Sequence, residues 1–427
     1  MDKIKKIMPQ SFKKLLIKKR YYYHRLLKKL SRNRDLRPPQ KTIAQQGMHC
    51  FFGYYDISPF SHDDRYLLGM QTSTPLISPG KGDNLDIGYY DLILDDPTFN
   101  KIGVTETWCW QQGCRLRWFS THPELVIYNT LVNGHYGSVV KDIYTGNTIQ
   151  EYPFSLYDLT KDGRFGITLN FSRLHRLRPG YGYSVLTDET ETEQCPEGDG
   201  VWLADLQSKK KRLLFSLDDL VKIEPHDTMQ DADHYINHLS FNPPGTSFIF
   251  FHLWHNTNSK QRYGRLFAAD TDGKNLTLIN NTGHVSHYTW LNESHIVITT
   301  RGVTNQLRYC LYDKRNGFEQ IIGDDVLVED GHPSFIHNGK FMITDTYPNL
   351  ARDQLLLLYH MNRNTRTVID RFHVPAEYKG EARCDLHPRP SSTGRYVCVD
   401  RVKHGLRAIS ILDLQDIIKQ EATPSIF

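Results

Sequence analysis

The stretch HYINHLSFNPPG, residues 234–245, places a histidine three residues before a phenylalanine and ends in a Pro/Gly turn. A similar arrangement returns in SHYTWLNES (286–294), GHPSFIHNG (331–339) and DLHPRPSSTG (385–394), where Trp290, Phe335 and Pro390 stand three residues after the histidine. One repeated position is therefore filled four times by histidine, at His238, His287, His332 and His387. Recurrence at this spacing is typical of a chain built from repeated β-units.

A second feature alternates with the first. It is a hydrophobic strand that ends on a polar turn, and it occurs seven times, at Asp91, Asp142, Asp205, Asp270, Asp313, His360 and Asp413. Successive occurrences lie 43 to 65 residues apart, the length of a four-stranded propeller blade with occasional insertions. The pattern predicts an all-β fold, a seven-bladed β-propeller over residues 43–427. Two β-sandwiches, the alternative, do not explain a paired feature that repeats seven times.

The N-terminal segment differs from the rest of the chain. Residues 1–38 hold fourteen Lys and Arg against two Asp, whereas the whole chain carries only +4, so the propeller body is acidic. In SFKKLLIKKRYYYHRLLKKLS (11–31) apolar residues recur at helical spacing between the basic ones. No apolar run is long enough for a signal peptide or a membrane span. We expect residues 1–42 to form a basic amphipathic helical arm with a linker.

Such a helix suits an anionic membrane surface, bound through residues 1–38. This predicts a cytoplasmic protein, peripheral at the inner face of the membrane. A partner-docking helix and a solvated tail are the alternatives. Nucleic acid is not expected as a partner, because the acidic body does not continue the basic track.

Several classes of protein are disfavoured by what the sequence lacks. The seven cysteines are scattered and form no CxxC pair, which argues against a disulfide framework and fits a reducing compartment. There is no phosphate-binding loop, dinucleotide fingerprint, HExxH or GxSxG motif.

The repeated histidines suggest a metal site. In a propeller the first strand of each blade lines the axis, so residues at the same position of consecutive blades should converge there. Imidazoles suit first-row divalent ions, and Asp385, two residues before His387, could add a carboxylate. We therefore predict a metal site at His287, His332, His387 and Asp385, with manganese favoured and iron or zinc also suitable. The alternatives are metal-free catalytic histidines and histidines that only link neighbouring blades.

The run HYINHLSFNP, the turn-rich blades and the ring of histidines resemble the oligogalacturonate lyases, which are seven-bladed propellers related to the TolB type. The resemblance implies manganese held by histidines and a glutamine, and β-elimination on uronate oligosaccharides with a histidine as base. It implies that His238 is the base and that His287 and His387 are metal ligands. The last blade departs from the family pattern, with Ala382 in place of the glutamine and Asp385 in place of a histidine.

Elimination also needs a cation for the uronate carboxylate and an acid for the leaving oxygen. Arg115, in the histidine position of the second blade, is the predicted carboxylate clamp, and Tyr55 the predicted acid at an exposed channel mouth. GMHCFFGYYDISPF (47–60) could form a sugar-stacking platform that includes His49, or could pack where the ring closes, as we expect for its phenylalanines. The insertion at 171–200 predicts a cationic loop over an anionic sugar or, equally, a solvated loop; its candidate ligands are Arg173, His175, Arg178 and Tyr181.

These features favour a metal-assisted, carbohydrate-active enzyme, lyase-like, acting on an acidic oligosaccharide or lipid-linked glycan in surface-polysaccharide metabolism. A non-catalytic propeller that serves as a binding or scaffold protein at the membrane surface is the alternative, since the fold suits both.

Overall fold

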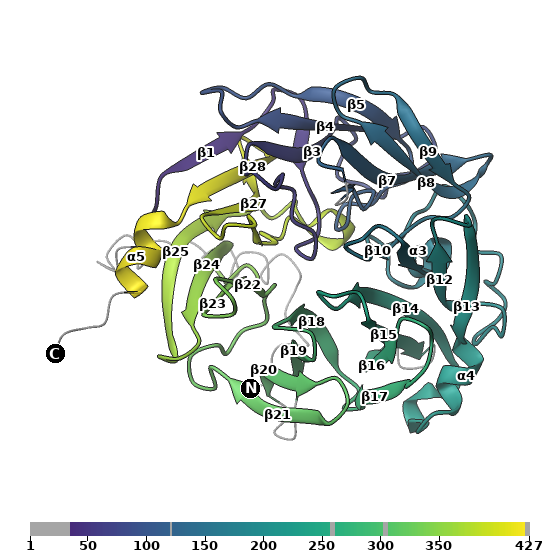
Figure 1. Cartoon of the computed structure of the whole chain (residues 1–427). Coiled ribbons are helices and arrows are strands. Elements are labelled where there is room, and N and C mark those ends of the chain that lie inside the picture. The colour runs from purple at the N-terminus through teal and green to yellow at the C-terminus, as the bar shows by residue number, and fades with distance from the viewer. Residues whose placement is uncertain (1–34, 120–121, 257–260, 302–305, 423–427) are drawn as a thin grey trace, which may run out of the picture.

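The computed structural model describes residues 35–119, 122–256, 261–301 and 306–422. Within these residues the chain forms seven four-stranded antiparallel sheets, which close into a ring around a central axis (Figure 1). The predicted all-β, seven-bladed propeller is confirmed. The predicted N-terminal amphipathic helix lies outside the described residues.

Each blade is a meander whose first strand lies nearest the axis (Figure 1). Blade 1 consists of β2 (His49–Phe51), β3 (Tyr66–Thr72), β4 (Leu85–Asp91) and β5 (Asn100–Thr105). Blade 2 consists of β6 (Arg117–Trp118), β7 (Leu125–Val132), β8 (His135–Asp142) and β9 (Thr148–Tyr152). Blade 3 consists of β10 (Asp158–Leu159), β11 (Phe165–Thr168), β12 (Gly200–Asp205) and β13 (Lys210–Ser216). Blade 4 consists of β14 (Ala232–Phe241), β15 (Ser247–Asn256), β16 (Arg262–Asp270) and β17 (Thr277–Asn280).

Blade 5 consists of β18 (Val285–Trp290), β19 (His295–Arg301), β20 (Leu307–Asp313) and β21 (Gly317–Ile322). Blade 6 consists of β22 (Ser334–Ile336), β23 (Phe341–Asp345), β24 (Asp353–His360) and β25 (Thr365–His373). Blade 7 consists of β26 (Arg389–Pro390), β27 (Tyr396–Lys403), β28 (Leu406–Asp413) and β1 (Gln40–Ile43). Short helices lie between strands or after the last one, at α3 (Phe171–Leu177), α4 (Leu217–Lys222), η1 (Asp227–Met229), η2 (Gly380–Ala382) and α5 (Gln415–Ala422).

Blade 7 is built from both ends of the chain, and this closes the ring. Strand β1 pairs with β28 in the register Gln40↔Leu412 to Ile43↔Ile409. The predicted boundary between residues 42 and 43 therefore falls inside a strand of the propeller. Of the phenylalanines of 47–60, Phe60 packs with Ile43 of β1 and Ile409 of β28 at this closure, as expected. Phe51 and Phe52 are buried in a cluster with Trp108 and other apolar residues of blades 1 and 2, and the Phe52 N–H donates to Asp400 of blade 7.

The polar residue that marks each repeat is the last residue of the third strand of a blade, at Asp91, Asp142, Asp205, Asp270, Asp313, His360 and Asp413. Its side chain accepts hydrogen bonds from the turn that follows. The Asp142 carboxylate accepts from the backbone N–H groups of Tyr144 and Thr145, at 2.9 and 2.8 Å. In blade 6, Nδ1 of His360 accepts from the backbone N–H of Arg363 at 3.2 Å. A short side chain with an acceptor stabilises a strand-to-turn junction, which explains why the residue type recurs.

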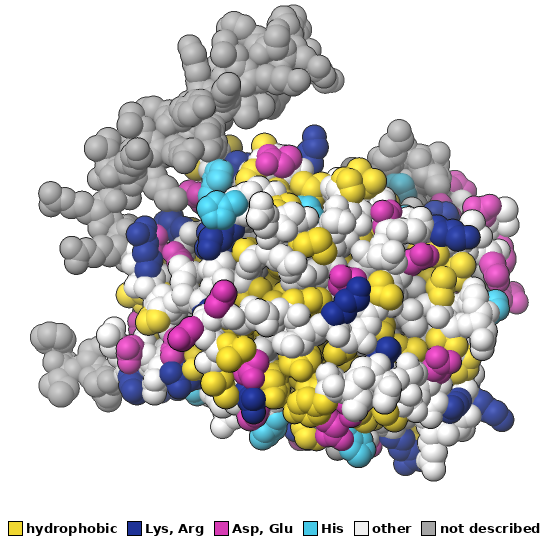
Figure 2. All heavy atoms as spheres, turned by 90° about the horizontal axis from the view of Figure 1, so that it is seen from above, with side chains coloured by type: hydrophobic (Ala, Val, Ile, Leu, Met, Phe, Trp, Pro, Cys, Tyr) yellow, Lys and Arg dark blue, Asp and Glu magenta, His cyan; other side chains and the backbone are white. Residues whose placement is uncertain are grey.

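Apolar side chains fill the interfaces within and between blades. In blade 4, for example, the rings of Phe250 and Phe267 stack with centroids 5.3 Å apart, and both are fully buried. The outer wall of blades 1 and 2 retains exposed apolar residues, including Ile93, Tyr144 and Ile149, at 70%, 64% and 55% exposure. Figure 2, which views the ring from the side of β1, β4 and β5, shows hydrophobic side chains interspersed with charged ones.

Two further expectations can be compared with this architecture. All seven cysteine thiols are free, in agreement with the predicted lack of a disulfide framework. Among the helices in the described part of the chain, none has the length and apolar character that crossing a bilayer requires.

Candidate metal centre

Three of the four repeated histidines meet at the axis. His287 lies in β18, and His332 and His387 lie two residues before β22 and β26, so consecutive blades supply them. The ring centroids of His287 and His332 are 4.1 Å apart, and those of His332 and His387 are 4.3 Å apart. Their exposures are 3%, 1% and 2% respectively. The repeat therefore gathers a cluster of imidazoles that is closed to solvent.

Each of these rings uses Nδ1 to contact an oxygen that can only accept a hydrogen bond. Nδ1 of His332 lies 2.8 Å from Oδ1 of Asp345, and Nδ1 of His287 lies 2.9 Å from Oδ1 of Asp330. Nδ1 of His387 lies 2.8 Å from the Gly53 carbonyl oxygen. Nδ1 must therefore carry the hydrogen, and in the neutral ring Nε2 keeps its lone pair. This tautomer and this kind of support are typical of metal-binding histidines.

The Nε2 atoms are the available ligands. Those of His332 and His387 are buried and have no hydrogen-bond partner. The ligand atoms of His332, His387 and Asp385 all lie within 4.8 Å of one another. A buried nitrogen lone pair without a partner is costly, and two of them beside a carboxylate make a site that suits a divalent transition metal.

The Asp385 carboxylate is already paired with a cationic side chain, that of Arg383. Nε of Arg383 donates to Oδ2 of Asp385 at 2.6 Å, whereas the same oxygen lies 3.9 Å from Nε2 of His387. Asp385 is 3% exposed, so this carboxylate has left water and needs a positive partner. A metal ion at this site would therefore have to compete with Arg383 for one oxygen donor.

Burial sets the protonation of most of these rings. It lowers the pKa of His387 well below 6.5, and it lowers that of His287 despite the nearby Asp330 carboxylate. At His332 burial acts in the same direction, but the Asp345 carboxylate outweighs it, and the pKa is raised. Neutral imidazoles are the form that binds metals.

The fourth histidine, His238, lies apart from the other three, with Tyr54 between. The Tyr54 ring stacks on His238 with centroids 5.1 Å apart and meets His387 edge-on at 4.9 Å. Nε2 of His238 is 3.4 Å from the Tyr54 hydroxyl, and Nδ1 is 3.2 Å from the Tyr157 hydroxyl. Burial, followed by the positive charge of Arg178, lowers the pKa of His238 well below 6.5, so the ring is a neutral potential base.

An unusual backbone conformation is shared by three of the repeated positions, although not by His287 or His332. His238, His387 and Arg115 all have left-handed φ angles, of 52°, 47° and 57°. At His238 this coincides with a register shift between Asn237 and Ser240. Left-handed backbone is unfavourable for residues other than glycine and costs on the order of 1–3 kcal/mol, and such strain clusters at functional sites.

Arg115 and Tyr55 reach the axis but are engaged by the protein itself. The Arg115 guanidinium binds both carboxylate oxygens of Asp56, at 3.0 and 2.9 Å, and the Tyr157 carbonyl oxygen. The Tyr55 hydroxyl donates to the Tyr288 carbonyl oxygen at 2.7 Å and accepts from the Tyr288 N–H at 2.8 Å. The expected exposure of Tyr55 is wrong, since the residue is only 4% exposed in the packed axis.

His49 and Arg173, both predicted to bind substrate, are buried and hydrogen-bonded to other parts of the protein. His49 is buried, its Nδ1 accepts from the Arg407 N–H at 3.2 Å, and its ring meets that of Trp110 edge-on. Arg173 is 1% exposed. Its guanidinium donates to the carbonyl oxygens of His234, Thr190, Glu193 and Gln194. It therefore anchors the insertion rather than presenting its charge to a ligand. His175, two residues further along α3, is half-buried, and burial lowers its pKa.

Other residues of the insertion do reach the centre. The Tyr181 ring lies 6.0 Å from that of Tyr54 and 5.7 Å from that of His238. Its hydroxyl accepts from Nη2 of Arg383 at 2.5 Å, and the Arg178 guanidinium lies over its ring at 4.6 Å. Two cations thus flank Tyr181 beside the histidines. This corrects the solvated-loop alternative for Arg178 and Tyr181.

An axial cavity of about 320 Å³ adjoins the centre. Tyr55, Tyr288 and Pro333 belong to its lining, and these residues border His287 and His332 in space or in sequence. Trp290, Asn242 and Ser240 line it further along the axis.

Several residues of the centre were not identified from the sequence: Asp330, Asp345 and Arg383. The spacing of Asp330 in the sequence could have drawn attention to it. Asp330-Gly-His332 repeats the spacing of Asp385-Leu-His387, so both histidines follow an aspartate by two residues. Asp330 supports the histidine of the preceding blade, a pairing that the spacing alone does not disclose.

Comparisons with known proteins agree with this architecture. No protein-family model and no curated protein matches the chain. Among solved structures, an oligogalacturonate lyase in complex with manganese is similar at 13% identity and a TM-score of 0.59, over 89% of this chain and 95% of that one. An oligogalacturonate lyase from Vibrio parahaemolyticus is similar at 13% identity and a TM-score of 0.57, over 90% and 99%. TolB from Acinetobacter baumannii also matches, at 13% identity and a TM-score of 0.36, over 66% and 59%. The chain thus resembles the oligogalacturonate lyases in fold.

Proposed function

We propose that the protein is a metal-assisted, carbohydrate-active enzyme that cleaves an acidic, uronate-containing glycan by β-elimination, in surface-polysaccharide metabolism. The observation that carries the proposal is the pair of buried, unpartnered Nε2 atoms of His332 and His387 beside the Asp385 carboxylate. The likeness to lyase propellers supports it at the level of the fold.

His332, His387 and Asp385 would hold the metal, and His287 is the adjacent imidazole that could join them. Manganese is the preferred ion, and iron or zinc would also suit these donors. When bound, the ion supplies positive charge that makes the proton next to a uronate carboxylate more acidic.

The chain's own residues supply the other requirements. His238 is neutral, and Nε2 points to the Tyr54 hydroxyl, so this pair can accept and relay a proton. Arg178, whose guanidinium lies over the Tyr181 ring, is the cation placed to bind a carboxylate. Arg383, which donates to the Tyr181 hydroxyl, would become available only if a metal ion took its place at Asp385. Arg115 is less suitable, because its guanidinium is already neutralised by Asp56.

The site is not a copy of the family's pattern. Ala382, which replaces the glutamine, is 3% exposed and lies in an apolar cluster. Asp385, which replaces a histidine, brings a negative charge that Arg383 balances. We therefore expect a ligand set of histidines and one carboxylate.

Metal analysis of the purified protein tests the first part of the proposal. We expect about one equivalent of metal, lost in His332→Ala/His387→Ala with the fold retained. His295→Ala is the matched control. His295 lies near Asp313 and Glu319 in a second, more exposed group, but both of its ring nitrogens have hydrogen-bond partners. No metal in the wild type, or equal loss in both variants, would favour the non-catalytic scaffold.

Absorbance near 232 nm tests the chemistry, because elimination produces a conjugated unsaturated uronate. Incubation with uronate oligosaccharides should raise this absorbance, and His238→Ala should abolish the rise while leaving the metal content unchanged. A product that forms without the absorbance change would assign a different reaction.

We also propose that the basic arm, residues 1–38, holds the protein at an anionic membrane surface, cytoplasmic and peripheral at the inner face, where lipid-linked glycans are handled. Protein without residues 1–34 should lose sedimentation with vesicles that contain anionic lipid, while the intact chain sediments with them. Vesicles of neutral lipid are the control, and equal binding to both kinds would contradict the proposal.

A further inference from the structure

A groove of about 950 Å³ lies across blades 3, 4 and 5, away from the histidines. Its walls include the turn before β11, the turn and first residues of β13, and the turns of blades 4 and 5. The insertion leaves blade 3 between β11 and β12, at the opposite end of these strands. The groove and the metal centre are therefore separate places on the propeller.

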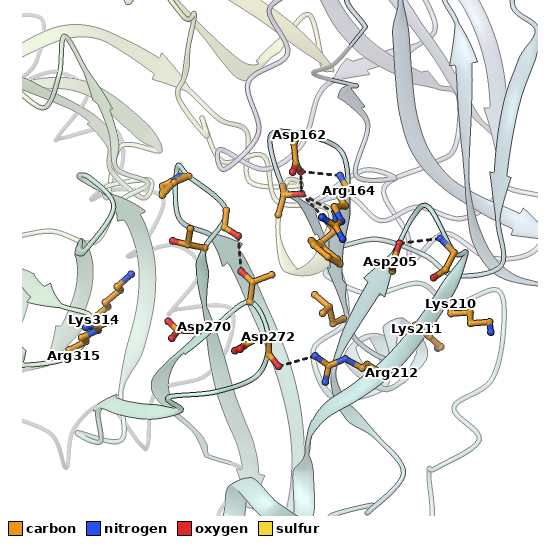
Figure 3. Close-up of a pocket in the computed structure, with 18 residues that line it drawn as sticks. Asp162, Arg164, Asp205, Lys210, Lys211, Arg212, Asp270, Asp272, Lys314 and Arg315 are labelled. Carbon is orange, nitrogen blue, oxygen red and sulfur yellow. Dashed lines mark hydrogen bonds between the residues drawn. The ribbon is translucent and has the colours of Figure 1, made fainter.

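The groove is rich in cations. Figure 3 shows Lys314 and Arg315 on one side, and Arg164 and the run Lys210 to Arg212 on the other. Four carboxylates share the groove, at Asp162, Asp205, Asp270 and Asp272 (Figure 3). Within the described ranges, none of the six basic residues forms a salt bridge with any of them.

The repeats of the propeller provide an internal comparison for one of these residues. Arg65, Arg164 and Arg395 occupy the same place in blades 1, 3 and 7, and each guanidinium lies over the ring of the following aromatic residue, at 4.7, 4.8 and 4.8 Å. Each also accepts, through its carbonyl oxygen, a hydrogen bond from the residue after the terminal aspartate of β4, β12 or β28. The three arginines are structurally equivalent.

The three arginines differ in whether they form a salt bridge. Arg65 pairs with Asp91 at 2.9 Å and Arg395 with Asp413 at 2.7 Å, both in the groove between blades 7 and 1. The equivalent pair in blade 3, Arg164 and Asp205, forms no salt bridge. Asp205 instead accepts from the N–H groups of Gln207 and Ser208, at 2.9 and 3.1 Å. In the groove of blades 3 to 5, Arg164 and Asp205 are therefore not paired, whereas the equivalent residues of the groove between blades 7 and 1 form salt bridges. We call the latter the closed groove.

The hydrogen bonds and charges of the other groove residues indicate which chemical class of ligand the groove suits. Two of the other basic residues donate to uncharged acceptors: Arg212 to the Asp272 carbonyl oxygen at 2.9 Å, and Lys314 to the Ser247 hydroxyl at 2.6 Å. Unpaired guanidinium and ammonium groups bind carboxylates. The carboxylates among them accept hydrogen bonds from hydroxyl groups but repel a dense row of phosphates. Cations interspersed with carboxylates therefore suit a ligand that has both carboxylate and hydroxyl groups.

We propose that this groove is a second binding site, for an acidic oligosaccharide, separate from the metal centre. Its volume lies within the range of about 300–1,000 Å³ that is common for ligand pockets. This inference rests on the proposed function in one respect: both assume that the ligand is an acidic oligosaccharide. It does not depend on the metal or on elimination, so the two can fail independently.

The test measures binding of fluorescently labelled oligogalacturonate to the full chain in EDTA, so that no metal chemistry contributes. Arg164→Glu/Arg315→Glu should weaken binding about tenfold, because two cationic contacts become repulsive. The matched control, Arg65→Glu/Arg395→Glu, changes the net charge equally, at the two positions equivalent to Arg164, both in the closed groove, and should alter binding less than about twofold. The basic arm is present in all three proteins.

Equal weakening in both variants would overturn the proposal, because it would assign the binding to net charge. Unchanged affinity for the methyl-esterified oligosaccharide would overturn the carboxylate requirement. Tighter binding of duplex DNA or polyphosphate to the same groove residues would assign the groove to phosphates instead. Circular dichroism of both variants controls for folding, and Arg164→Gln provides the milder change if reversal disturbs the turn.

Discussion

Asp345 holds His332 from two sides. Its Oδ1 accepts from the His332 backbone N–H and lies 2.8 Å from Nδ1 of the ring, and its Oδ2 accepts from the backbone N–H of His387 at 3.1 Å. One carboxylate in β23 therefore fixes the ring of one proposed ligand and the backbone of the next. This aspartate is 1% exposed, so its carboxylate depends on such protein groups in place of water.

Replacing this carboxylate should weaken the metal site without removing a ligand. Asp345→Asn keeps an acceptor but loses the charge that orients the ring and raises its basicity, and supporting groups of this kind are worth about 10–100-fold in metal affinity. Competition with a chromogenic chelator measures the change. Asp370→Asn, a buried aspartate in the outer strand of the same blade, is the control and should leave the affinity unchanged.

Arg383 should act in the opposite direction. In Arg383→Gln the Asp385 carboxylate no longer has a competing cation, so we expect manganese to bind about tenfold more tightly. Without metal the same variant should lose about 1–3 kcal/mol of unfolding free energy, since a buried carboxylate is left uncompensated beside a partly exposed arginine position. Chelator competition and thermal unfolding, each with and without manganese, measure the two effects.

Arg395→Gln is the matched control for this prediction, because it breaks an exposed arginine–aspartate pair in the same blade. It should change neither quantity by more than a few tenths of a kcal/mol. If Arg383→Gln binds manganese no better than the wild type, Asp385 is not a ligand and the site is one of histidines alone.

The fold could be predicted because its repeat appears in the sequence. A polar residue, aspartate in six blades and histidine in one, ends the third strand of each blade at the following turn, so a local requirement recurs seven times in the chain. Strand β1 could not be predicted in the same way. QKTI is short and mostly polar, and it becomes a strand because the edge of β28 lies beside it.

The candidate site was only partly predictable for a related reason. The repeated histidines share a position and therefore an axis, but the partners that define their chemistry come from distant segments. Tyr181 and Arg383 are separated by 202 residues. In the sequence Arg173 resembles a ligand-binding residue. In the structure its guanidinium donates to backbone carbonyl oxygens, including one of the irregular insertion, which need a buried donor. Composition does not distinguish these roles.

Ring closure through β1 gives a third prediction. Ile43 is 5% exposed and packs with Ile409 and Ile411 of β28. Ile43→Ala should lower the free energy of unfolding by about 2–4 kcal/mol, because it opens a cavity at the one blade that both chain ends build. Urea denaturation measures the loss. Gln40→Ala, an exposed position of the same strand, should cost less than about 0.5 kcal/mol, and equal losses would show that closure contributes little.

Buried neutral histidines make the fold sensitive to acid. Burial lowers the pKa of His49 and of His234 from 6.5 to about 4. The unfolded chain therefore binds protons at these positions before the folded chain does, and stability should fall as the pH drops from 6.5 towards 4. Each such histidine contributes a slope of about 1.4 kcal/mol per pH unit within that window and none above it. Urea unfolding at pH 7.5, 6.0 and 5.0 measures the slope.

His49→Gln should reduce this slope by about one proton, because glutamine retains an acceptor for the Arg407 N–H but does not titrate. His62→Gln changes an exposed histidine and should leave the slope unchanged. The comparison separates His49 from the other buried imidazoles, which are common to both variants. A slope that is the same in the wild type and in His49→Gln would mean that His49 is protonated as readily in the folded chain as in the unfolded one. Burial between Trp110 and Tyr378 would then not exclude its charge.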